Sequence, residues 1–343
     1  MAVKYKYEGT GFRDWTDRAG QYDRGFLLRL YRSMLRIRII EEEIEKRYHE
    51  DQMKTPIHLV IGQEATSVGC CAALTDADLL YSSHRTHGNY LAKGGDLKAM
   101  LSEMFCRANG CAGSRGGSMH LIDKKVGMAG TSAIVGGAIP VATGAALATQ
   151  MQKLDRACVV FFGEAAAEEG VTSESLNFAA VKQLPMIYFC ENNYYSVQSP
   201  LAPRQHPDRV VWKWAASYGM TGVAVDGTNV LAVFEATKEA ARRARAGGGP
   251  TFIEAPVYRF RAHGGAGDDS KTGYRDVAER EAWEPYCPIK TYREFLERTG
   301  VLNAQAHEQM QREILAETLA AFEHAMASPN PVEADLHRNV YAS

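Results

Sequence analysis

The stretch VVFFGEAAAEEGVTSESLNFAAVKQLPMIYFCENNYYS, residues 159–196, decides the fold. Two short apolar runs, VVFFG and PMIYFCEN, flank a segment whose apolar residues recur at helical spacing. Apolar strands that alternate with amphipathic helices are typical of a parallel sheet covered on both faces. The first run ends at Glu164 and the second at Asn192 and Asn193, so oxygen-bearing side chains follow two neighbouring strands.

The same alternation continues toward the C-terminus. We predict strands at VAVDG and TFIEAPVYRF, and long helices at 24–50, from Gln63 onward, at 137–151, at 229–246 and at 303–327. The sequence therefore predicts an α/β fold: a doubly wound, mostly parallel sheet with helices on both faces and helical N- and C-terminal extensions. The predicted division is a leader and helix at 1–55, an α/β domain at 56–290 and a helical segment at 291–343. Helix 137–151 has almost no polar face, which predicts burial inside the fold or against another subunit.

Composition excludes several classes of function. The 343 residues carry a net charge of −2, so no general affinity for nucleic acid or an anionic membrane is expected. The N-terminus lacks the apolar core of a signal peptide, and no apolar run approaches the roughly 20 residues that cross a bilayer. The seven cysteines, odd in number, agree with a reducing compartment. We therefore expect a cytoplasmic protein.

The polar residues after the two strands suggest a metal site. In open parallel sheets, ligands bind beyond the carboxyl ends of the strands, where helix N-termini offer N–H groups to anions. The carboxylate of Glu164, the amide of Asn193 and a nearby backbone carbonyl suit Mg²⁺ or Ca²⁺, and magnesium usually brings phosphate oxygens. A diphosphate would then bind at the same turn. The alternative is that the asparagines form a turn and Glu164 is an ordinary acid at a helix N-terminus.

The stretch resembles the thiamine diphosphate motif, in which Gly-Asp-Gly is followed further along the chain by Asn-Asn. It is most similar to alpha subunits of the thiamine-dependent first component of 2-oxo acid dehydrogenase complexes, including the pyruvate, branched-chain and acetoin enzymes. The resemblance covers most of the chain, because further blocks follow in the order of that family: HLVIGQEATSVGCCAAL (58–74), SSHRTHGNYLAKGGDLKAML (82–101), GSRGGSMHLID (113–123), AIVGGAIPVATGAAL (133–147) and YRFRAH (258–263).

The resemblance implies a set of cofactor contacts. The metal ligands would be the side chains of Glu164 and Asn193 and the backbone carbonyl of Tyr195. The remaining contacts to thiamine diphosphate would come from Gly163, which opens the motif, from the N–H groups of Ala165 and Ala166, from Arg85 and Arg259 at the phosphates, and from Ala133 and Val135 at the aminopyrimidine. Arginine suits phosphate because its charge is permanent and its donors are forked. Taken alone, either arginine could instead be a surface or ion-pair residue.

The resemblance also implies catalytic histidines. His263, in a glycine-dense loop, and His58 match positions that handle protons or stabilise a developing oxyanion near the reacting centre. The resemblance also implies that His58, His84 and His263 contact the cofactor, although His84 stands where many relatives have an aromatic residue. A histidine taken alone is more often a structural hydrogen-bonding residue.

The function implied is that of an enzyme subunit. Thiamine diphosphate acts as an electron sink, so the enzyme would decarboxylate a small 2-oxo acid, or cleave a related ketone, and pass the acyl or aldehyde unit to an acceptor. In the family the acceptor is a lipoyl group on an acyltransferase, and a separate beta subunit supplies the activating glutamate, so an α2β2 assembly is expected. Two alternatives stay open: a carboligase or acyl-donor enzyme of a specialised biosynthetic pathway, and a scaffold subunit whose cofactor site has decayed.

The chain departs from the family pattern in the motif itself. Glu164 replaces an aspartate and Ala165 a glycine, which would cost about 1 kcal/mol if that position needed a positive φ. Glu168 and Glu169 add negative charge that would weaken diphosphate binding unless a metal or an arginine compensates. After His263, GGAGDD replaces the phosphorylatable serines of mitochondrial relatives, so kinase control of that type is not expected.

Overall fold

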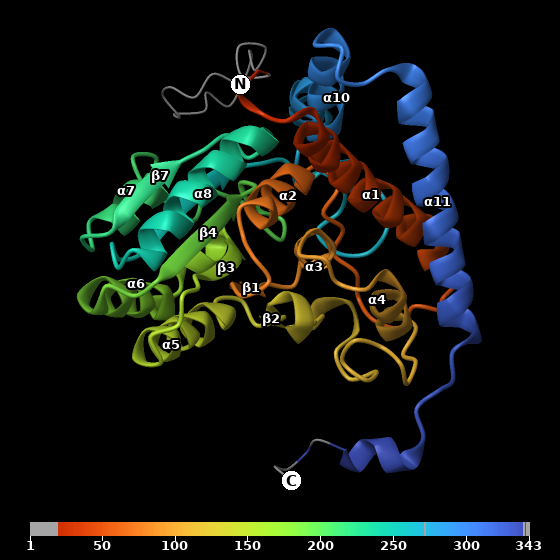
Figure 1. Cartoon of the computed structure of the whole chain (residues 1–343), viewed down its shortest axis with the longest axis horizontal. Coiled ribbons are helices and arrows are strands. Elements are labelled where there is room, and N and C mark those ends of the chain that lie inside the picture. The colour runs from red at the N-terminus through yellow and green to blue at the C-terminus, as the bar shows by residue number, and fades with distance from the viewer. Residues whose placement is uncertain (1–19, 271, 339, 341–343) are drawn as a thin grey trace.

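The computed structural model describes residues 20–270, 272–338 and 340 (Figure 1). Most of the predicted N-terminal leader, residues 1–19, lies outside the described residues, and with it the prediction that no signal peptide is present. In the described part of the chain, no helix combines the length and the apolar character that a membrane span needs.

The centre of the structure is a parallel sheet, which confirms the predicted doubly wound α/β fold. Its six strands lie in the order β2-β1-β3-β4-β8-β7. Their bounds are β1 Leu79–Ser82, β2 Met128–Thr131, β3 Cys158–Gly163, β4 Met186–Asn192, β7 Thr221–Ala224 and β8 Thr251–Pro256. A separate antiparallel pair follows β4: β5 Tyr195–Ser196 and β6 Ser199–Pro200. All strands of the main sheet therefore end on one edge.

Helices cover both faces of the sheet (Figure 1). One side carries α1 Arg24–Tyr48, α2 Glu64–Ala72 and α8 Val230–Arg245, and the other carries α5 Ala138–Met151, α6 Gly170–Lys182 and α7 Val211–Ala216. The remaining helices are α3 His87–Ala92, α4 Leu97–Met104, α9 Val277–Trp283, α10 Pro288–Arg298 and α11 Ala304–Ala327, the last packing against α1 and α4. The predicted long helices are thus present, within a few residues of their expected bounds.

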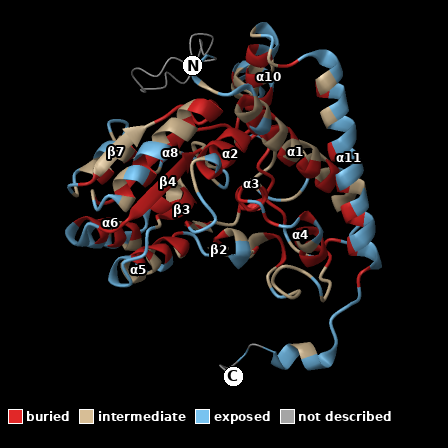
Figure 2. Ribbon diagram, in the orientation of Figure 1, coloured by how far each residue is buried: buried red, intermediate tan, exposed pale blue. Residues whose placement is uncertain are grey.

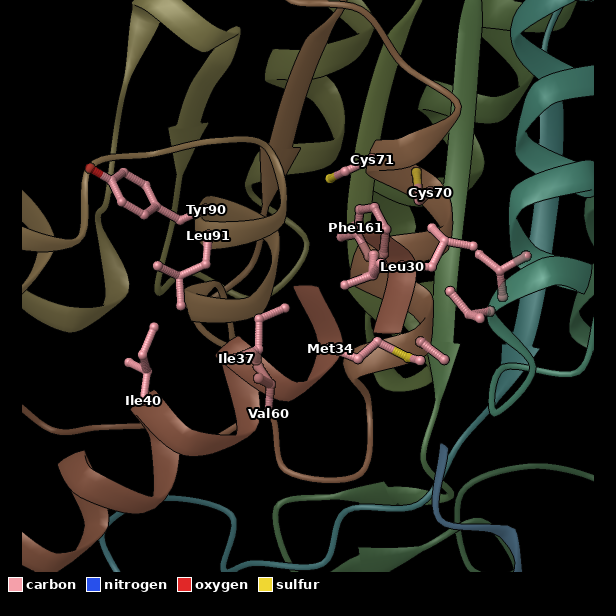
Figure 3. Packing of buried hydrophobic residues seen from close by; sticks show 14 of the residues in the cluster. Leu30, Met34, Ile37, Ile40, Val60, Cys70, Cys71, Tyr90, Leu91 and Phe161 are labelled. Atoms are coloured by element: carbon pink, nitrogen blue, oxygen red, sulfur yellow. The ribbon is translucent and has the colours of Figure 1, made fainter. Parts of the chain in front are cut away.

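Alternating side chains of the strands build two cores. In β3, Val159 and Phe161 join the cluster beneath α1, whereas Val160 and Phe162 join the cluster beneath α5 and α6. Figure 3 shows Phe161 close to Met34 and Leu30 of α1. Because the strands are buried on both faces, they read in the sequence as continuously apolar runs.

The predicted burial of helix 137–151 holds for one side of α5. Ala142 and Ala146 are buried against the sheet, but Val141 and Met151 are 60% and 74% exposed (Figure 2). Val181 of the neighbouring α6 is also exposed. Exposed apolar side chains therefore lie on the outer side of α5 and, at Val181, on α6.

Candidate functional site

A cavity of about 200 Å³ lies where the strands of the sheet end. Segments that follow β1, β2, β3, β4 and β8 all contribute to its wall. It is lined by His58, Gln63, Ser83, His84, Arg85, Met119, Ala133, Val135, Gly136, Gly163, Glu164, Ala165, Ala166, Glu191, Asn193, Tyr195, Ser196, Val197 and His263. Of the predicted site residues, only Arg259 does not line this cavity. The parallel topology brings the others together from distant parts of the sequence.

One wall, the oxygen end, consists of Glu164, Asn193 and Tyr195. Glu164 opens a 3₁₀ turn directly after β3 and is 1% exposed. The side-chain oxygen of Asn193 accepts a hydrogen bond from the backbone N–H of Tyr195 at 3.2 Å, which fixes the turn after β4. All three residues line the cavity. The carboxylate, amide oxygen and backbone carbonyl that they carry are ligands of the kind that Mg²⁺ and Ca²⁺ take, so the residue types fit a divalent ion.

The backbone beside the oxygen end is strained. Tyr194 and Val197 have left-handed φ values of 69° and 55°, although neither is glycine and Val197 is β-branched. Such conformations cost of order 1–3 kcal/mol each and persist where the surroundings impose them, often at functional sites. The two residues flank the segment 195–196, which lines the cavity.

The turn that carries Glu164 does not require glycine. Residues 164–168 form the 3₁₀ helix η4, and no residue of this turn is among those with positive φ in the described chain. Ala165 therefore avoids the cost that a left-handed backbone would impose on it. The replacement of glycine in the motif is compatible with the observed turn.

An arginine pairs with two acids of the turn, Glu164 and Glu168. Arg204 Nη2 lies 2.6 Å from Glu164 Oε1, and its Nη1 lies 2.5 Å from Glu168 Oε1. Burial raises the pKa of Glu164, and the charge of Arg204 opposes that shift. The acids of the turn predicted a compensating arginine or metal, but Arg204 could not be identified from the sequence, because it lies forty residues after Glu164 in an irregular loop.

The two arginines predicted at the phosphates differ in placement. Arg85 lines the cavity and donates to the backbone carbonyl oxygens of Leu59 and His263, the latter at 3.0 Å. Arg259 is 2% exposed and donates instead to Asp269 at 3.2 Å and to the hydroxyl of Tyr274 at 2.9 Å. In this conformation Arg259 therefore holds the loop after β8 and does not face the cavity.

A second group of cavity residues, the histidine end, consists of His58, His84 and His263. The ring centroids are 4.6 Å apart for His58 and His84, 5.1 Å for His58 and His263, and 5.4 Å for His84 and His263. Burial, and then the nearby charge of Arg85, lower their pKa values to about 2, about 3 and about 4 in the order His58, His84, His263. All three imidazoles are therefore neutral near pH 7 and can accept or donate hydrogen bonds without carrying charge.

A buried network supports the segment that carries His58. Glu41 of α1 accepts from the backbone N–H of Val60 at 2.7 Å and pairs with His87 Nδ1 at 2.6 Å, while His87 Nε2 lies 2.7 Å from the hydroxyl of Ser118. Glu41, His87 and Ser118 are fully buried. The network therefore has no access to substrate and serves to position the backbone beside the cavity.

Sequence reasoning missed Glu191, which precedes the asparagine pair. It is 7% exposed, lines the cavity and accepts a hydrogen bond from the Thr66 hydroxyl. Burial raises its pKa to about 7, although Thr66 and the charge of Arg85 oppose that shift. Its position at the carboxyl end of β4 could have identified Glu191 as a cavity residue from the sequence.

Comparisons with known proteins identify relatives over most of the chain. A sequence model of the family described as "Dehydrogenase E1 component" matches residues 32–333. The chain is 37% identical to the alpha-3 subunit of the chloroplastic pyruvate dehydrogenase E1 component of Arabidopsis thaliana, over 92% of this chain and 74% of that protein. It is also 37% identical to the alpha subunit of acetoin:2,6-dichlorophenolindophenol oxidoreductase of Bacillus subtilis, over 92% of this chain and 93% of that protein. The corresponding alpha subunit from Cupriavidus necator is 36% identical, over 94% and 96% respectively.

Proposed function

Because the chain belongs to the dehydrogenase E1 component family, we propose that it is the alpha subunit of a thiamine diphosphate-dependent 2-oxo acid dehydrogenase or acetoin dehydrogenase-like enzyme. One observation carries the proposal: the oxygen end and the histidine end face a single cavity at the carboxyl edge of the sheet. A cofactor bound there would have its phosphates near cation ligands and its reacting part near neutral imidazoles.

The residues divide the work between the two ends. Glu164, Asn193 and the Tyr195 carbonyl would hold Mg²⁺ or Ca²⁺, and the N–H groups at the start of η4 would hold the diphosphate. When bound, thiamine diphosphate supplies an electron sink for cleavage beside a carbonyl carbon. His263 and His58 are placed to hold or pass a proton at their ring nitrogens.

A beta subunit is part of the proposal. The cavity of about 200 Å³ is smaller than the usual ligand pocket of roughly 300–1,000 Å³, which agrees with a site completed by a second chain. The exposed apolar side chains Val141 and Met151 of α5 and Val181 of α6 offer contacts for an obligate partner. An α2β2 assembly, with a lipoyl-bearing acyltransferase as the acceptor, is the form we propose.

Calorimetric titration tests the cofactor proposal. Thiamine diphosphate titrated into the complex of the chain with its beta subunit should bind with Mg²⁺ present and not with a chelator present. The melting temperature should rise only with both ligands, since ligands that bind the folded state stabilise it. No heat and no thermal shift with both ligands present contradict the proposal and favour a scaffold subunit.

Product analysis then identifies the reaction. Pyruvate, branched 2-oxo acids and acetoin are supplied in turn, with and without a lipoyl domain. Acyl transfer that depends on the lipoyl domain supports the dehydrogenase. A carbon–carbon coupled product formed without the lipoyl domain supports a carboligase instead.

A further inference from the structure

Arg204 sits between two carboxylates at the rim of the oxygen end. Its guanidinium contacts Glu164 at 2.6 Å and Glu168 at 2.5 Å, and its Nε donates to the carbonyl oxygens of Ser199 and Pro200 at 3.2 Å each. Every nitrogen of the guanidinium is therefore engaged, and the side chain is 12% exposed. Such forked, charge-assisted bonds fix both distance and orientation.

Glu164 is also the carboxylate that the proposed metal ion needs. Arg204 and a divalent cation would bind the same buried carboxylate, and the two cations repel each other at that range. Metal binding at Glu164 therefore requires Arg204 to release it, wholly or in part. An unpaired carboxylate at this depth would be unfavourable in the metal-free chain, which gives Arg204 its role before the ion arrives.

Glu168 offers the second position that such an exchange needs. Its side chain is 26% exposed, against 1% for Glu164, and it also accepts a hydrogen bond from Gln205 Nε2 at 2.6 Å. Arg204 can keep its Glu168 contact after it leaves Glu164, so its charge stays beside the turn without blocking the ion. Glu168, the first acid of the AAAEEG turn, would then have a function.

We propose that Arg204 is a positioning residue that neutralises Glu164 in the metal-free subunit and competes with the divalent ion for it, with Glu168 retaining the arginine once the ion binds. This inference rests on the proposed cofactor site. The inference predicts opposite effects for substitution of Arg204 and of Glu168. Removal of Arg204 strengthens metal binding. Removal of the Glu168 charge weakens metal binding, because Arg204 then has only Glu164 as a carboxylate partner.

The test is a Mn²⁺ titration of the complex with its beta subunit at saturating thiamine diphosphate, with free Mn²⁺ measured by its paramagnetic resonance signal. Arg204→Met should lower the apparent dissociation constant by about ten- to a hundredfold, the order of a hydrogen bond between charged groups. Its melting temperature without metal should fall, and its rise on Mn²⁺ addition should exceed that of the parent complex.

Two further variants sharpen the test. Glu168→Gln should raise the apparent dissociation constant, and should have no effect when Arg204 is already methionine. Arg209→Met is the matched control, because Arg209 lies in the same loop and donates to the Ala167 carbonyl of the same turn at 3.0 Å without contacting either carboxylate. Its Mn²⁺ affinity should match the parent.

The outcomes separate the inference from the proposal beneath it. Unchanged or weaker Mn²⁺ binding in Arg204→Met overturns the inference alone, as does tighter binding in Glu168→Gln. If Arg204→Met does not fold, Glu168→Gln decides the question by the sign of its effect. Absence of Mn²⁺ binding in the parent complex overturns the proposed cofactor site, and the inference with it.

Discussion

The two ends of the cavity handle charge in opposite ways. At the oxygen end a buried carboxylate, Glu164, stays next to a cation, since Arg204 pairs with it at 2.6 Å. At the histidine end the three imidazoles lose their charge, because burial and Arg85 lower their pKa values. An ion-paired wall can exchange one cation for another, whereas a wall of neutral imidazoles can exchange hydrogen bonds and protons. The difference assigns phosphate and metal to one wall and the reacting centre to the other.

The largest effect is expected when the carboxylate of the oxygen end is removed. Glu164→Gln should lower the affinity for thiamine diphosphate with Mg²⁺ by more than about a hundredfold, since even residues that only orient a metal ligand cost 10–100-fold when changed. Calorimetric titration of the complex with its beta subunit measures the effect. Unchanged, magnesium-dependent binding would show that the ion sits elsewhere.

The next largest effect is expected from a substitution at the histidine end that leaves the oxygen end intact. His263→Gln should lower the rate by about 10²–10⁴-fold, the usual contribution of a group that moves a proton, while cofactor affinity changes little. Steady-state turnover and calorimetry on the same preparation separate the two quantities. The matched control is His206→Gln, an exposed histidine that should leave both unchanged. A full rate in His263→Gln would remove that residue from the chemistry.

Acid should destabilise the chain through the histidine end. The pKa of His58 falls from an ordinary 6.5 to about 2 in the folded chain, so below pH 6.5 the unfolded chain binds a proton that the folded chain does not. The free energy of unfolding is therefore fully retained above pH 6.5 and decreases as the pH falls below that value. Between pH 6.5 and pH 5 one such histidine costs about 2 kcal/mol of unfolding free energy.

Urea unfolding at pH 6.5 and pH 5 measures this loss. His58→Gln should lose about 2 kcal/mol less than the parent over that interval, because the variant has one fewer buried neutral imidazole. His206→Gln should follow the parent, since that ring is exposed. Equal losses in His58→Gln and the parent would mean that His58 is protonated in the folded chain.

The smallest effect concerns the strained turn between the ends. Val197→Gly should change the free energy of unfolding by less than about 1 kcal/mol in the stabilising direction, because relief of a left-handed β-branched residue slightly exceeds the added entropy of the unfolded chain. The control is Val181→Gly on an exposed face of helix α6, which should destabilise by about 0.5 kcal/mol, the difference in helix propensity between valine and glycine. Destabilisation of similar size in both variants would show that Val197 carries no strain.

The fold was predictable where the strands are long and buried. β3, β4 and β8 read as mostly apolar runs, and in the helices between them the apolar residues recur at helical spacing. Two strands were not predicted, β1 (LLYS) and β2 (MAGT). Each has only four residues, several of them partly exposed, and β2 contains a glycine, so neither shows a distinct apolar pattern. Their pairing beside β3 depends on contacts that only the assembled sheet supplies.

The location of the site could be predicted from the sequence, but the ion pairs and hydrogen bonds within it could not. Parallel strands ending on one edge bring Glu164 and Asn193 to one cavity, which the sequence could indicate. The orientation of Arg259 depends on Asp269 and Tyr274, and the neutralisation of Glu164 depends on Arg204. Neither pairing follows a sequence spacing, because irregular loops bring these residues together.

Anomalous diffraction from crystals of the complex grown with thiamine diphosphate and Mn²⁺ tests the division of the cavity most directly. We predict one manganese peak at the oxygen end, within about 2.2 Å of Glu164, the Asn193 amide oxygen and the Tyr195 carbonyl, as expected for a hard cation. The three histidine nitrogens, which lie within 4.8 Å of one another, offer the competing location. A peak on His58, His84 and His263, or none beside Glu164, would contradict the account.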